Sequence, residues 1–244
     1  MSESDIRAAA PTEGKNTQDN DPEHFLHPTY FIDFDNPKVR AFAEEKTAAA
    51  KSDVEKAVRL FYAVRDGIRY NPYELKIEPE VYRASYTLEA GVGWCVPKGI
   101  LMTAVSRAAG IPARPGYADV LNHLATKRFQ KMMGTGIFSY HGYVELWLNG
   151  QWVKVTPVFN IELCEKFGVL PQDFDGTSDA LFQEHDRAGR KHMEYVEDRG
   201  AYDDLPLTEI MTDFDNRYSD YMIAVRSGLV GDFMAEAAAE GKST

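Results

Sequence analysis

A β-hairpin is the feature that most limits how this chain can fold. Residues 140–148 and 151–158 are two strand-like runs, and Asn149-Gly150 joins them. This dipeptide favours a two-residue turn that fixes how the strands pair. Counting back from the turn, one face pairs Trp147 with Trp152, Glu145 with Lys154, Tyr143 with Thr156, and His141 with Val158.

The two faces of this hairpin differ in character. One face carries only aliphatic side chains, which are Val144, Leu146, Val153 and Val155. That face is the core side, so His141 and Thr156 on the opposite face look toward a site or toward solvent. Thr156 is the diagonal neighbour of His141 in this register, close enough for its hydroxyl to orient the imidazole ring.

A second strong signal is a helix that begins at Cys95. Gly91 and Gly93 make the residues just before it a turn, and Pro97 suits the first helical turn. The apolar stripe that follows, before Gly110 and Pro112 stop the helix, contains Ile100, Leu101, Ala104, Val105 and Ala108. The sequence therefore places Cys95 at a helix N-terminus.

This position gives Cys95 a chemical interpretation. A thiol attacks only as the thiolate, and a helix N-terminus and a nearby histidine both lower its pKa. The free N–H groups of the first turn can also hold the oxyanion that forms when a thiolate adds to a carbonyl. Taken singly, Cys95 reads as a buried hydrophobe and His141 as a structural histidine. Their positions together favour a nucleophile and its base.

Three segments resemble the transglutaminase-like superfamily: residues 84–95, residues 107–114, and residues 141–147 with 152–157. The similarity covers roughly residues 50–165. It implies an α+β, papain-like fold in which the catalytic cysteine lies at a helix N-terminus packed against an antiparallel β-sheet. It further implies Cys95 as nucleophile, His141 as general base, and Trp94 beside the oxyanion site.

The third position of the family's triad departs from this pattern. Thr156 stands where the family usually has an aspartate. A threonine hydroxyl can fix the imidazole tautomer but cannot stabilise the imidazolium by charge. In serine triads, replacement of the Asp by Asn costs about 10⁴ in turnover, and a cysteine should lose less because its thiolate is a good nucleophile. We expect a Cys95–His141 dyad assisted by Thr156 or by Asn160. Lys98, one turn beyond Cys95, is a candidate to bind an acidic substrate group, although a solvated lysine is the commoner outcome.

The expected function is a cysteine-dependent acyl-transfer enzyme that hydrolyses an amide or peptide bond of a small-molecule or peptide substrate. Two alternatives stay open at this point. One is a catalytically altered relative that acts on another small carbonyl compound, and the other is a non-catalytic binding or scaffold protein. Cys164, the second cysteine, is expected to be a buried spectator.

Composition excludes several other classes. The net charge of -11 disfavours binding to nucleic acid or to an anionic membrane surface. No apolar stretch is long enough to span a bilayer and no signal segment is apparent, so we expect a cytoplasmic protein. The histidine spacing matches no metal-ligand pattern and no calcium loop is present, so neither a metal nor an organic cofactor is expected. The oligomeric state stays open.

The chain is expected to form one domain. Residues 1–22 are polar and aperiodic, which predicts a disordered tail. Residues 23–240 would form the transglutaminase-like domain, with its core at about 50–165 and a C-terminal helical extension. Helices are expected at residues 52–65, around 178–187, and from about 207 to 239 with a break near Gly228.

Overall fold

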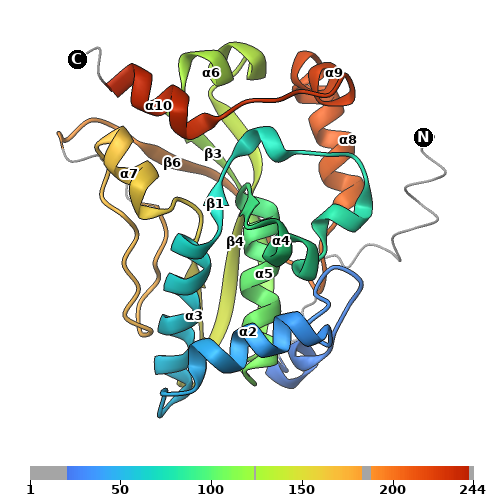
Figure 1. Ribbon diagram of the computed structural model, residues 1–244, viewed down its shortest axis with the longest axis vertical. Coiled ribbons are helices and arrows are strands. Elements are labelled where there is room, and N and C mark those ends of the chain that lie inside the picture. Colours follow the sequence, from blue (N-terminus) through green and yellow to red (C-terminus); the bar gives the residue numbers. More distant parts are fainter. Residues whose placement is uncertain (1–20, 124, 183–187, 242–244) are drawn as a thin grey trace.

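The computed structural model describes residues 21–123, 125–182 and 188–241, and it has the predicted α+β architecture (Figure 1). The main sheet is antiparallel and has the strand order β5-β4-β3-β6. Its strands are β3 (Ala113–Asn122), β4 (Ile137–Leu148), β5 (Gln151–Val155) and β6 (Met193–Ala201). Helices α3 (Asp53–Gly67) and α5 (Cys95–Ala108) lie across one face of the sheet (Figure 1).

The remaining elements surround this pair of layers. A short parallel pair, β1 (Arg69–Tyr70) and β2 (Val92–Gly93), brings the segments after α3 and before α5 together. The 3₁₀ helices are η1 (Pro22–Leu26), η2 (Pro72–Glu74) and η3 (Pro79–Tyr82). The other α-helices are α2 (Pro37–Thr47), α4 (Ala84–Ala90), α6 (Lys127–Met133), α7 (Ile161–Phe167), α8 (Leu207–Arg217), α9 (Ser219–Arg226) and α10 (Phe233–Gly241).

The hairpin forms in the predicted register over its first five pairs. Asn149 and Gly150 both have positive φ values, 51° and 82°, as a type I′ turn requires. Pairing then runs from Leu148–Gln151 to Val144–Val155. The expected pairs of Tyr143 with Thr156 and of His141 with Val158 are wrong, because β5 ends at Val155 and the Thr156 N–H donates to the Ala180 carbonyl at 3.0 Å.

His141 takes its place in the sheet from β3 instead. Its partner there is Ala118, and the register shifts just beyond that pair, between Ala118 and Val120. Tyr140, the residue before His141, has a positive φ of 51°. Its N–H donates to the Asp119 carboxylate at 3.2 Å, and Arg199 on β6 binds that carboxylate with two hydrogen bonds of 2.6 and 2.8 Å. A partly buried ion pair therefore holds the irregular backbone next to His141.

Helix α5 begins at Cys95 and ends at Ala108, as predicted. It is the central helix, because every residue from Cys95 to Arg107 is buried. Its first turn approaches β4 closely: a Cβ on Gly142 would lie 3.1 Å from the Cys95 carbonyl oxygen. This contact would be tighter than most Cβ contacts, so Gly142 helps the start of α5 to lie close to the strand that carries His141.

The helices predicted outside the hairpin and α5 are confirmed in part. Helix α3 is capped by Ser52, whose hydroxyl accepts from the Glu55 N–H. The C-terminal extension breaks at Gly228, as predicted, and a second time at Tyr218 between α8 and α9. The helix expected around residues 178–187 is wrong for 178–182, which are not helical, and its other residues lie outside the described ranges. Most of the predicted tail, residues 1–20, also lies outside them.

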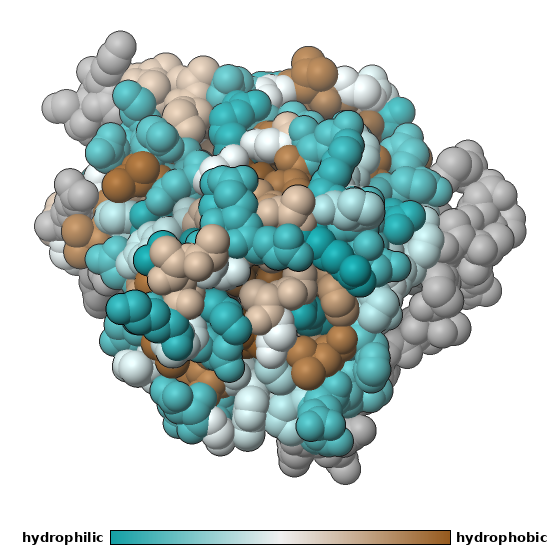
Figure 2. All heavy atoms as spheres, turned by 60° about the horizontal axis from the view of Figure 1, so that its bottom comes forward, coloured by the Kyte–Doolittle hydropathy of each residue, from teal (hydrophilic) through white to brown (hydrophobic). Residues whose placement is uncertain are grey.

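The surface agrees with the acidic composition. Figure 2, which turns the bottom of Figure 1 toward the viewer, shows a mainly hydrophilic face with hydrophobic residues in small separate groups. Across the described ranges, no helix has the length and apolar character needed to cross a membrane.

Candidate active site

Cys95, His141 and Trp94 line one pocket. Its lining combines the start of α5 with residues of the C-terminal helices α8, α9 and α10, which are drawn in orange to red in Figure 1. Half of the lining residues are Phe, Tyr or Trp, and the cavity measures about 50 Å³. The structure therefore brings three of the predicted site residues to one small, mostly apolar pocket.

The Cys95 sulfur lies at a meeting point of backbone donors. The N–H groups of Gly142, Val96 and Cys95 itself point at it and lower its pKa. The side chain is only 6% exposed, and burial has the larger effect, raising the pKa of the thiol to about 12. In the resting protein Cys95 is therefore a neutral thiol, with N–H groups in place for the negative charge it would acquire as a thiolate.

His141 faces the same pocket as a neutral imidazole. Its side chain is 6% exposed, and burial lowers its pKa to about 3. Neither ring nitrogen has a hydrogen-bond partner among the described residues, so neither is hydrogen-bonded to the Cys95 sulfur. The ring packs edge-on against Phe182 at a centroid distance of 5.0 Å. Both nitrogens are thus free to exchange a proton with Cys95 or with a bound substrate.

Thr156 does not orient His141 by a direct hydrogen bond. Its hydroxyl is fully buried and has no hydrogen-bond partner in the described part of the chain, which corrects the predicted contact. Burial raises the pKa of the nearby Tyr195 hydroxyl and Thr156 opposes that shift, although the two groups fall short of hydrogen-bond geometry. The Tyr195 hydroxyl in turn accepts from the N–H of Phe182, whose ring contacts His141. Thr156 is therefore linked to His141 through two aromatic residues.

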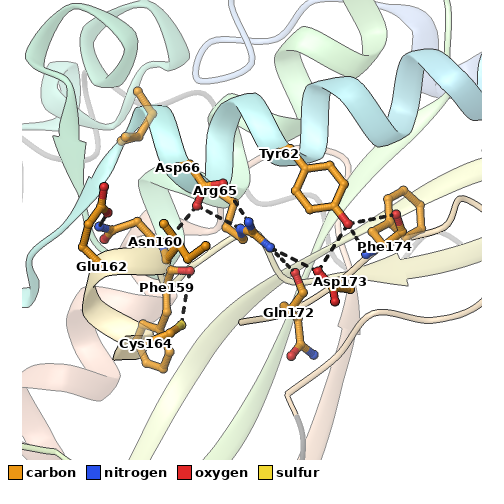
Figure 3. Close-up of polar contacts among 12 residues, drawn as sticks. Tyr62, Arg65, Asp66, Phe159, Asn160, Glu162, Cys164, Gln172, Asp173 and Phe174 are labelled. Carbon is orange, nitrogen blue, oxygen red and sulfur yellow. Dashed lines mark hydrogen bonds and ion pairs between the residues drawn. The ribbon is translucent and has the colours of Figure 1, made fainter. Parts of the chain in front are cut away.

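Asn160, the alternative orienting residue, has another role. Its Oδ1 accepts from the Tyr70 N–H at 3.1 Å, and its Nδ2 donates to the Glu162 carboxylate at 2.6 Å (Figure 3). Both ends of the amide are thus engaged in joining β1 to the start of α7. Cys164 lies nearby on α7, buried, with its sulfur 3.8 Å from the Phe159 carbonyl oxygen (Figure 3).

Lys98 is not at the pocket, which corrects the prediction that it binds substrate. Its side chain is fully buried, and its ammonium group donates to the carbonyl oxygens of Arg65 at 2.9 Å and Ile68 at 2.5 Å. These carbonyls lie at the C-terminal end of α3, where a helix attracts cations. Burial lowers the pKa of Lys98 to about 7. Lys98 is a buried cap that joins α5 to α3.

Trp94 precedes α5 and packs against Tyr82 and Phe214, with ring centroids 6.2 and 5.9 Å away. Its backbone leads directly into the turn that presents the sulfur.

Gly142 is a site residue that the sequence could have revealed, because a glycine inside a strand often marks a close backbone approach. Within the described ranges, no cluster of three or more His, Cys, Asp or Glu side chains could hold a metal ion.

Residues 40–157 match the family model of the transglutaminase-like superfamily. No curated protein matches the sequence. One similar structure is described as a putative cysteine protease from Cytophaga hutchinsonii, with 18% identity and a TM-score of 0.45 over 74% of this chain and 53% of that one.

A second similar structure is described as a putative protease from Parabacteroides distasonis ATCC 8503. It has 16% identity and a TM-score of 0.36 over 49% of this chain and 23% of that one. The chain thus spans about half of the first of these proteins and about a quarter of the second. The segment from α2 to just beyond the hairpin, residues 40–157, forms a transglutaminase-like superfamily domain.

Proposed function

We propose that the protein is a cysteine-dependent acyl-transfer enzyme that hydrolyses an amide or peptide bond through a thioester on Cys95. The observation that carries this proposal is the shared pocket: a thiol surrounded by backbone N–H groups lines the same cavity as an imidazole whose nitrogens have no hydrogen-bond partner among the described residues. Cys95 and Cys164 are not joined by a disulfide, which suits a reducing compartment, so we place the reaction in the cytoplasm, with a small molecule or a peptide as substrate.

The chemistry follows from the neutral resting state. The Cys95 proton passes to His141 as the sulfur bonds to the substrate carbonyl carbon, and the backbone N–H groups that faced the sulfur stabilise the developing negative charge. The amine leaves with the proton from His141, and a thioester remains on Cys95. Water then gives a proton to His141 as it attacks the thioester carbonyl, and the thiol re-forms when the carboxylic acid departs. Catalytic hydrogen bonds of this kind often tighten only when substrate binds.

A non-catalytic binding protein is the second candidate. It is favoured by the threonine at position 156 and by the absence of a hydrogen bond between Cys95 and His141. A relative with altered chemistry on another small carbonyl compound would share the enzyme's first step. The first step therefore separates the enzyme candidates from the binding candidate.

The test is acylation of the protein by p-nitrophenyl acetate, followed by release of p-nitrophenolate and by the mass of the Cys95 peptide. We expect one acetyl group on Cys95, no acylation of Cys95→Ser, and an unchanged rate in the matched control Cys164→Ser. His141→Gln should slow acylation about a hundredfold or more, as expected for a lost general base. Equal rates in the native protein and Cys95→Ser would overturn the proposal.

A further inference from the structure

The far wall of the pocket comes from outside the family domain. Phe214 on α8, Tyr218 and Tyr221 around α9, and Phe233 at the start of α10 all line the cavity that contains Cys95 and His141. These residues follow the matched segment, residues 40–157, by more than fifty positions. The C-terminal extension therefore shapes the space beside the nucleophile.

Helix α10 is held firmly in this position. The Glu236 carboxylate accepts hydrogen bonds of 2.8 Å from the hydroxyls of Tyr73 and Thr126 and from the guanidinium of Arg128. Just before the helix, the Gly231 carbonyl accepts from the Asn71 amide at 3.0 Å. Contacts with η2, α6 and the segment between them thus fix the helix that carries Phe233, and the wall is preformed rather than induced.

The lining has a definite chemical preference. No residue among its described members carries a charge at neutral pH. The Tyr218 and Tyr221 hydroxyls are engaged with backbone, since they donate to the carbonyls of Ile137 at 3.0 Å and Pro72 at 2.6 Å. Their rings are what remains for a ligand, and a carboxylate or ammonium group would enter this site without a group of opposite charge.

The volume of the cavity limits which uncharged groups it can hold. The cavity of about 50 Å³ is roughly a third of the 150 Å³ that holds a benzene molecule, and it exceeds the space that one water needs. A phenyl ring does not fit without displacement of the aromatic wall. A chain of a few carbons does fit.

We infer that this pocket selects substrates whose carbonyl carbon bears an uncharged, short aliphatic group, with α8, α9 and α10 acting as the specificity element. This inference rests on the proposed acylation of Cys95. The aliphatic group lies against Phe214, Tyr221 and Phe233, and the carbonyl faces the Cys95 sulfur.

The first test compares p-nitrophenyl butyrate with the p-nitrophenyl monoester of succinic acid, which has a similar length and one negative charge. We expect butyrate to acylate Cys95 about a hundredfold faster, since the carboxylate would be desolvated without a group of opposite charge. The p-nitrophenyl ester of phenylacetic acid should react slowly with the native protein. Equal rates for butyrate and succinate, or for butyrate and phenylacetate, would overturn the inference.

Substitutions in the pocket lining test whether the C-terminal helices set the substrate preference. Phe233→Ala, or Phe214→Leu if the first does not fold, should raise the phenylacetate rate relative to the butyrate rate by about tenfold, in keeping with the space that a truncated ring leaves. Met234→Ala, on α10 beside Phe233 but not in the pocket lining, is the matched control and should leave this ratio unchanged. Unchanged ratios in both folded wall variants would contradict the assignment.

A binding measurement separates this inference from the proposed function. Met133 and Met193 line the pocket, whereas Met102 is buried elsewhere in α5. In Cys95→Ser labelled with ¹³C-methyl methionine, butyramide should shift the signals of Met133 and Met193 but not that of Met102, and succinamate should shift none. This result supports the pocket even if no ester acylates Cys95. Shifts with both ligands, or with neither, would refute the pocket independently of catalysis.

Discussion

The ionisation of Cys95 gives the sharpest prediction. Burial raises the pKa of this thiol from an ordinary 9.0 to about 12, and His141, with a pKa lowered to about 3, offers no positive charge near neutral pH. Three units of pKa mean about a thousandfold less thiolate at any pH below 9. Iodoacetamide should therefore alkylate Cys95 in the folded protein about a thousandfold more slowly than in the unfolded chain.

The pH dependence of the alkylation rate tests this prediction. In a Cys164→Ser background, so that one thiol reports, the alkylation rate should rise about tenfold per pH unit through the neutral range and show no plateau, because only the thiolate reacts. The same protein in guanidinium chloride serves as the control, with its rate levelling off near the ordinary pKa of 9.0. A plateau that extends below pH 7 in the folded protein would reveal a resting thiolate–imidazolium pair and refute this reasoning.

Three further predictions concern the frame of the site. Lys98 has a folded pKa of about 7 against an ordinary 10.5, so the unfolded chain binds more protons between these values. The unfolding free energy of the native protein, measured in urea, should therefore rise with pH relative to that of Lys98→Met by up to about 1.4 kcal/mol per unit from pH 7 upward; a constant difference would contradict the depressed pKa. Gly142→Ala should lose about 1–3 kcal/mol in urea unfolding and slow acylation of Cys95, because its Cβ meets the Cys95 carbonyl at 3.1 Å, whereas Gly99→Ala, with its nearest neighbour at 3.8 Å, should gain stability. Asp119→Asn breaks the partly buried pair with Arg199 and should lower stability by about 1–3 kcal/mol and the acylation rate as well, while an unchanged acylation rate would show that this pair does not position His141.

Local signals were sufficient for the parts of the fold that carry Cys95 and the hairpin. Asn149-Gly150 determines its own turn, and the register follows from it over five residue pairs. The helix from Cys95 to Ala108 has its stop signals within a few residues of its end. In each case the residues that decide the structure are neighbours in the sequence.

Contacts between segments that are distant in the sequence determine the features that were not predicted. The side chain of Lys98 is one turn from Cys95 in sequence, but the end of α3 passes over it and provides the carbonyls that it binds. Asn160 is taken by Tyr70, ninety residues earlier. The pairing of β3 with β6, and the placing of α10 over the pocket, depend equally on partners that no local pattern identifies. Sequence periodicity shows which face of an element is apolar but not which element covers it.

The threonine at position 156 is consistent with the neutral resting state of the dyad. A carboxylate would favour an imidazolium, but here the slot holds an uncharged, fully buried hydroxyl, and burial alone determines the pKa shift of His141. Thr156→Asp should therefore raise the pKa of His141 above about 3 by one to three units, which still lies far below the pKa of about 12 of Cys95, so the resting pair stays neutral.

This change would appear in an NMR titration of the His141 ring signals. Thr156→Asp should shift the titration of His141 upward by one to three pH units, because the carboxylate favours the imidazolium. Thr156→Asn is the matched control: it has the same shape without the charge, so His141 should titrate as in the native protein. If both variants showed the native titration, position 156 would be electrostatically uncoupled from His141, and the aromatic pair Tyr195 and Phe182 would only separate the two residues. A shift in the aspartate variant alone would show that the departure from the family triad helps to keep His141 uncharged in the resting protein.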